Sequence, residues 1–159
     1  MTAPFRSRQT VVIEAPLEDV WEFNLDLSQI EKYHPRVAKV DFVSGTSRRG
    51  AGVAYQCHLK GSRHTCTERD VEIVPMERIV TEFVTDSFGI SKLLPDYRVV
   101  STLARGDDGR TRVEFAHFYS TNSWKAKLFH WIAGRRIAKE SQATLNAIKS
   151  AIESRSTSR

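Results

Sequence analysis

The stretch Val11–Pro35, VVIEAPLEDVWEFNLDLSQIEKYHP, decides the fold because it predicts one strand and two helices in close succession. Val11–Ile13 is β-branched throughout and predicts a strand. Pro16 suits the first position of a helix, where its fixed φ fits and its missing N–H is not needed. Ser28–Glu31 matches a capping box, which predicts that a second helix starts at Ser28. His34 is expected to end that helix, since the residue before a proline avoids the α region.

The remainder of the chain predicts six strands followed by one long helix. The expected strands are Val37–Val43, Val53–Leu59, His64–Val74, Ile79–Thr85, Tyr97–Ala104 and Thr111–Tyr119. Short turns separate several of them, such as Lys60–Ser62 and Asp107–Gly109, so consecutive strands are expected to be antiparallel. The helix is predicted from about Asn122 to Ser154 with a cap in Thr121–Ser123, and the polar tail Ser154–Arg159 is expected to fray.

Length and composition indicate an ordinary globular domain. The 159 residues fit a single domain, 1–159, with a core at about 8–154, and the formal net charge is only +5. No apolar run is long enough to span a membrane, and the N-terminus lacks a stretch of signal-peptide length, so a cytoplasmic location is expected. The modest charge comes without a nucleic-acid-binding motif, so no nucleic-acid partner is expected.

Several short phrases, taken in order, resemble the START-like superfamily, which holds polyketide cyclases/dehydrases, lipid-transfer domains and plant pollen allergens. They are IEAPLEDVW at Ile13–Trp21, P-x-V at Pro35–Val37, PMERI at Pro75–Ile79, GRTRVEF at Gly109–Phe115 and LNAIKSAIES at Leu145–Ser154. The resemblance implies an α+β helix-grip fold, in which a curved seven-stranded antiparallel sheet, two short helices and a long C-terminal helix enclose a cavity. It also implies binding, with transport as an extension, of a hydrophobic or aromatic small molecule.

Two other functions stay open at this point. The first is a cyclase/dehydratase-type enzyme, in which His117 would act as acid or base while Tyr55 or Tyr97 orients an oxygen. The second is an interaction module that acts through its surface. The oligomeric state stays open as well, and neither a cofactor nor a metal is expected.

Alternation along the strands selects the candidate site residues. His117 is in phase with Val113, Phe115 and Tyr119, so all four are expected to face the cavity. His117 could be catalytic, could contact the ligand, or could be an ordinary buried histidine. The full set of candidate ligand-contacting residues is Tyr55, Arg69, Phe83, Tyr97, Phe115, His117, Tyr119, Phe88, Leu93, Trp124 and Leu128.

The register of the 64–74 strand is ambiguous. A tight turn at Gly61–Ser62 would place Cys57 opposite Cys66, and this register puts Glu68 and Asp70 on the face of Tyr55. The apolar pattern instead favours an inward face with Val71 and Ile73, which would carry Arg69 inward too. A longer turn or a bulge would resolve the conflict. The cysteines and the neighbouring His58 and His64 are zinc-type donors, but strand alternation would place His58 on the opposite face of the sheet from Cys57, which argues against a four-ligand site.

The segment Ser87–Pro95, SFGISKLLP, is apolar where a polar turn would suffice. It is expected either to cover the cavity as a lid or simply to pack in the core. Trp124, Phe129 and Trp131 would form the opposing wall. Nearby basic residues would allow transient contact with an anionic membrane, although solvated helix charges explain them more simply. These basic residues are Lys125, Lys127, Arg135 and Arg136.

Overall fold

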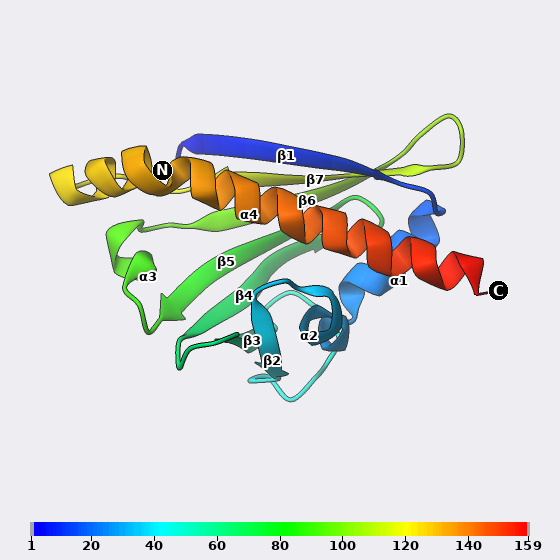
Figure 1. Ribbon diagram of the computed structural model, residues 1–159, viewed down its shortest axis with the longest axis horizontal. Coiled ribbons are helices and arrows are strands. Elements are labelled where there is room, and N and C mark those ends of the chain that lie inside the picture. Colours follow the sequence, from blue (N-terminus) through cyan, green and yellow to red (C-terminus); the bar gives the residue numbers. More distant parts are fainter. Residues whose placement is uncertain (1, 159) are drawn as a thin grey trace.

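The computed structural model describes residues 2–158, which form one antiparallel sheet and a long helix that crosses it (Figure 1). The helices are α1 (Leu17–Leu25), the 3-10 helix η1 (Leu27–Gln29), α2 (Ile30–Tyr33), α3 (Ile90–Leu93) and α4 (Trp124–Thr157). The strands are β1 (Phe5–Ile13), β2 (Val37–Asp41), β3 (Ala54–Leu59), β4 (Thr65–Val74), β5 (Arg78–Asp86), β6 (Arg98–Arg105) and β7 (Thr111–Phe118). Within residues 2–158, none of the helices combines the length and apolarity needed to cross a membrane.

The seven strands are ordered β1-β7-β6-β5-β4-β3-β2, and every neighbouring pair is antiparallel. The long helix α4 packs on β1 and β7 and touches α2 (Figure 1). The predicted α+β helix-grip fold, with its curved seven-stranded sheet, short helices and long C-terminal helix, is therefore confirmed.

The predicted capping box at Ser28 is wrong. Asp26 is the capping residue, because its carboxylate accepts the Ser28 backbone N–H at 3.0 Å. Glu31, which should have closed the box, instead accepts the backbone N–H of Val40 at 3.1 Å and ties α2 to β2. The helical segment therefore begins two residues earlier than predicted, and Asp26 satisfies a free N–H group at its start.

The ends of α4 are set by local chemistry and by packing. Ser123 accepts the backbone N–H of Ala126 at 3.1 Å, so the predicted cap is confirmed. The helix continues through Gly134 to Thr157, and Arg155 packs over the ring of Phe23 at 4.9 Å. The expectation that the tail frays from Ser154 is therefore wrong for the described residues, and only Arg159 lies outside them.

The main apolar core lies where α1, the ends of β1 and β7 and the last turns of α4 meet. Its fully buried members include Ile13, Val20, Val113, Leu145 and Ile148. The concave face of β3, β4 and β5 carries a different chemistry, because several of its inward side chains are polar or charged. The candidate functional site is built on that face.

Candidate functional site

A bulge in β4 decides which of its side chains face α4. Tyr55 pairs with Glu68 and Cys57 with Cys66, as a tight hairpin predicts. Beyond Asp70, which pairs with Thr81, the register shifts by one residue. Glu68 and Asp70 precede this bulge and face inward. The extra residue then shifts the alternation of β4 by one position, so Ile73 also packs against the core.

Arg69 consequently lies on the outer face of the sheet. Its guanidinium pairs with the Glu82 carboxylate at 2.9 Å, in an exposed position. The prediction that Arg69 faces the cavity is wrong, because the hairpin register and not the apolar pattern sets the phase of β4 before its bulge.

Inward residues of β3, β4 and β5, together with Arg49 from the loop before β3, form what we call the inner charged cluster: Arg49, Tyr55, Glu68, Asp70 and Thr81. Arg49 donates to the fully buried Asp70 at 2.6 Å and to the Tyr55 hydroxyl at 3.1 Å. Thr81 donates to the same Asp70 oxygen at 2.9 Å, and Tyr55 donates to Glu68 at 2.6 Å. The single positive charge of Arg49 thus stabilises two carboxyl groups on the concave face, Asp70 by direct contact and Glu68 through its field.

Burial makes both carboxyl groups of this cluster weaker acids. Removal from water raises the pKa of Glu68 and of Asp70, while Arg49 and the hydroxyl donors oppose that rise. Asp70 Oδ2 has no hydrogen-bond partner within residues 2–158. Glu68 keeps some accessible surface, whereas Asp70 has none. Of the two carboxyl groups, that of Glu68 thus belongs to the less completely buried residue.

A second polar group, which we call the neutral histidine group, consists of Tyr97, His117 and Ser141. The Tyr97 hydroxyl lies 2.9 Å from His117 Nδ1, and the Ser141 hydroxyl lies 2.8 Å from Nε2. Burial lowers the pKa of His117 to about 4, so the imidazole is neutral at pH 7. His117 does face α4, as its phase in β7 predicted, but both ring nitrogens already have partners, which favours the structural interpretation.

Aromatic side chains connect the two groups along the concave face. Phe83 lies 5.8 Å from Tyr97 and 6.5 Å from Phe88, measured between ring centroids. Tyr97 stacks on Tyr119 at 5.0 Å. Phe115, another candidate, packs against the main core. Strand alternation therefore brings most of the aromatic candidates to one side of the sheet.

The 87–95 segment folds as a packed element. The Asp86 carboxylate accepts backbone N–H groups from Phe88 and Ile90 at 2.8 Å and 3.1 Å, which orders the entry into α3. Leu94 is fully buried against Tyr119, and Leu93 packs at the edge of the same cluster. The core-packing alternative thus accounts for Leu94, and a lid role for the rest of the segment stays a prediction.

Trp124 and Leu128 do not lie in the interior. Both are exposed on the outer face of α4, while Ala126 is the buried residue of that turn. Trp131 is exposed as well, so of the three predicted wall residues only Phe129 packs against the 87–95 segment. The prediction is wrong because the first half of α4 has apolar residues on both sides, and a small side chain allows closer packing on the sheet than an indole does.

The two cysteines face each other as free thiols. A hydrogen bond with Cys66, together with burial, raises the pKa of the Cys57 thiol well above its usual value, so the thiol stays protonated. His58 pairs with Asp41 at 2.6 Å, away from the thiols. No group of three possible metal-ligating side chains occurs within residues 2–158.

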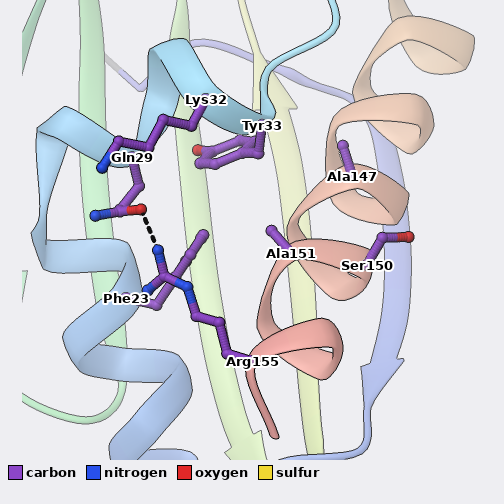
Figure 2. Close-up of a pocket in the computed structure, with 8 residues that line it drawn as sticks. All are labelled: Phe23, Gln29, Lys32, Tyr33, Ala147, Ser150, Ala151 and Arg155. Carbon is purple, nitrogen blue, oxygen red and sulfur yellow. Dashed lines mark hydrogen bonds between the residues drawn. The ribbon is translucent and has the colours of Figure 1, made fainter. Parts of the chain in front are cut away.

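A pocket of about 380 Å³ opens between α2 and the second half of α4 (Figure 2). Its lining residues are Phe23, Gln29, Lys32, Tyr33, Ala147, Ser150, Ala151 and Arg155. Arg155 and Lys32 bring two positive charges to this lining, which contains no carboxylate. The Arg155 guanidinium donates to the side-chain oxygen of Gln29 (Figure 2). None of these residues was a sequence candidate, because the pocket joins segments more than a hundred residues apart in the chain.

Tyr33 joins this pocket to the interior. Its ring lines the pocket and packs 5.5 Å from the ring of Phe23. Burial raises the pKa of its hydroxyl to about 12, and Arg49 and Glu68 lie close enough to act on it. The hydroxyl therefore stays protonated at neutral pH, and the ring lies between the pocket and the inner charged cluster.

Comparison with known proteins gives a family match and a set of fold relatives. Residues 4–153 match the model of the family described as polyketide cyclase / dehydrase and lipid transport. No protein with a curated description matches the sequence significantly. The Zhui aromatase/cyclase from Streptomyces sp. R1128 superposes with a TM-score of 0.71 at 20% identity, over 94% of this chain and 93% of that chain.

Two further structures show the same fold at low identity. A point mutant of norcoclaurine synthase from Thalictrum flavum, in complex with a transition state analogue, gives a TM-score of 0.75 at 10% identity, over 98% of this chain and 99% of that one. A protein from Nitrosospira multiformis gives 0.74 at 18% identity, over 96% and 99%. At these identities the likeness concerns the fold.

Proposed function

We propose, from the premise that this chain belongs to the polyketide cyclase/dehydrase and lipid transport family, that it binds a hydrophobic or aromatic small molecule between α2 and α4. The observation that carries this proposal is the pocket between α2 and α4, whose volume of about 380 Å³ lies within the usual range for small-molecule sites. Phe23, Tyr33 and Ala151 supply its apolar surface. These side chains suit an apolar or aromatic body.

The charges beside this surface specify a second property of the ligand. Lys32 and Arg155 line the pocket without a carboxylate among the other lining residues. A guanidinium binds planar anions through two parallel hydrogen bonds, and a nearby ammonium adds further attraction. The ligand we infer is therefore an apolar or aromatic molecule with an acidic or oxygen-rich group near α2. A longer ligand would extend past Tyr33 toward Glu68.

The test uses anilinonaphthalene sulfonate, a probe that combines an aromatic body with an anionic group. Ala151→Trp fills the pocket and should weaken probe binding about tenfold or more in a fluorescence titration. Arg155→Ser should weaken it about fivefold while leaving the uncharged parent, anilinonaphthalene, nearly unaffected. Ala143→Trp, on an exposed part of α4, is the matched control. Probe affinity that Ala151→Trp does not reduce would contradict the proposal.

Native mass spectrometry of the purified protein identifies the natural ligand class. A co-purifying apolar species with an acidic or phenolic group, released by denaturing extraction, would support the proposal. His117→Phe should keep probe affinity within about tenfold of the wild type, because the histidine sits in a satisfied internal group and not in the pocket.

A second candidate function is cyclase/dehydratase-type catalysis. The observation that favours it is the Glu68 carboxyl on the concave face, whose pKa burial raises and which accepts a hydrogen bond from the Tyr55 hydroxyl at 2.6 Å. A raised pKa keeps a carboxyl group protonated to a higher pH than usual, which suits a general acid. Glu68→Gln should abolish turnover of a polyketide-type substrate and leave probe binding unchanged, if the enzyme hypothesis holds. Retained turnover would show that Glu68 is not the catalytic acid or base, and His117 would remain the candidate for that role.

A further inference from the structure

The first half of α4 presents an apolar stripe that nothing in the described structure covers. Trp124, Leu128, Trp131 and Ile132 are 70%, 47%, 80% and 65% exposed. Their spacing places them on one face of the helix, opposite Ala126, which is 1% exposed. Single exposed apolar residues are common on proteins, but two exposed indoles and two aliphatic side chains in one stripe indicate a contact surface.

The same segment concentrates the positive charge of the chain. Between Thr121 and Lys139 the sequence has five Lys or Arg residues and no Asp or Glu, so this segment alone matches the formal net charge of +5 of the whole chain. All five are exposed, and they are Lys125, Lys127, Arg135, Arg136 and Lys139. Within residues 2–158, only Arg136 among them forms an ion pair, with Glu140 at 3.1 Å.

We propose that this face of α4 docks on the surface of an anionic lipid bilayer. Indole rings favour the interfacial region of a bilayer, where the ring is apolar and the N–H remains hydrogen bonded. Lys and Arg beside an apolar helix face gain roughly 1 kcal/mol each from anionic headgroups. The stripe and the flanking cations therefore match the two layers that an interfacial helix meets.

Charge complementarity selects the bilayer over a second copy of this chain. A symmetric contact through the stripe would bring two identical sets of five cations together. The side of α4 opposite the stripe packs on Leu94 and Tyr119, so docking would need no rearrangement of the core. The proposal does not depend on which small molecule the pocket binds.

The test is cosedimentation with vesicles of phosphatidylcholine containing about one third phosphatidylserine, compared with pure phosphatidylcholine. The wild type should bind the mixed vesicles, and salt should weaken this binding. Trp124→Ser together with Trp131→Ser should reduce affinity about tenfold or more, and should remove the blue shift in tryptophan emission, because the remaining Trp21 is buried. Lys125→Ser and Lys127→Ser should each cost about fivefold.

Matched controls are Val43→Ser, an exposed apolar residue elsewhere, and Arg63→Ser, an exposed cation at the β3–β4 turn. Both should leave vesicle binding unchanged, and all variants should keep the wild-type melting temperature. Failure of the wild type to bind the mixed vesicles would overturn the proposal, as would full binding by the double tryptophan variant. Sedimentation velocity that shows a dimer lost in that variant would assign the stripe to self-association instead.

Discussion

The inner charged cluster and the neutral histidine group lie on the same concave face, but they tolerate burial in different ways. Asp70 is fully buried and remains compatible with the fold because Arg49 and Thr81 donate to it. His117 has no charged partner, and burial lowers its pKa to about 4, so it gives up its proton instead. One region therefore depends on a paired charge, and the other on hydrogen bonds between neutral groups.

The largest expected effect comes from removing the only cation of the charged cluster. Arg49→Met leaves Asp70 buried beside no positive charge. Breaking a buried ion pair from one side costs about 3–5 kcal/mol. Urea unfolding at pH 7 should show this loss in the free energy of unfolding.

Two variants control that experiment. Arg48→Met breaks an exposed pair with Glu22 and should leave the free energy of unfolding nearly unchanged, because water screens that pair. Adding Asp70→Asn to Arg49→Met removes the stranded charge and should recover part of the lost stability. A double variant as unstable as the single one would mean that Arg49 acts through packing and not through charge.

An intermediate effect is expected from the pH dependence of the neutral histidine group. The pKa of His117 is about 4 in the folded protein, against 6.5 ordinarily, so the unfolded state binds more protons between these values. Stability therefore decreases as the pH falls from 6.5 to 4, and His117 accounts for about 3 kcal/mol of that decrease. His117→Gln should flatten the profile by this amount, measured by urea unfolding at several pH values.

The control for this profile is His64→Gln, at an exposed position in the β3–β4 turn. It leaves His117 in place and should keep the wild-type slope. His34, whose pKa burial also lowers to about 4, adds a separate contribution of the same sign. Glu68 and Asp70 contribute to the stability with the opposite sign from the two histidines, because their raised pKa values favour the folded state as the pH falls. A His117→Gln profile as steep as the wild type would refute the neutral-histidine interpretation.

The smallest expected effect comes from Ser141, the last member of the neutral histidine group. Ser141→Ala removes the hydroxyl that lies 2.8 Å from His117 Nε2 and leaves one buried ring nitrogen without that partner. The expected loss is about 1–2 kcal/mol in the free energy of unfolding. Ser150→Ala, an exposed position on the same helix, should be neutral within about 0.5 kcal/mol. Equal values for the two variants would show that the contact contributes nothing to stability.

Strand patterning and helix capping in the sequence predict most of the fold and part of the site. Alternation places Tyr55, Phe83, Tyr97 and His117 on the concave side, and the structure agrees. These signals are local, since a period of two or a capping serine needs no knowledge of distant residues. The pocket residues carry no such signal, because Gln29 and Arg155 meet only when α4 crosses the sheet.

The order of the elements and their antiparallel pairing followed from the sequence alone, because periodicity and turn chemistry act over a few residues. Only the tertiary structure decided that Arg69 points outward, through the hairpin register of β4. It also decided which face of α4 is buried. Hydrophobicity favours Trp124 inside, yet close approach to the sheet requires a side chain as small as Ala126, and packing volume is a property of two surfaces together.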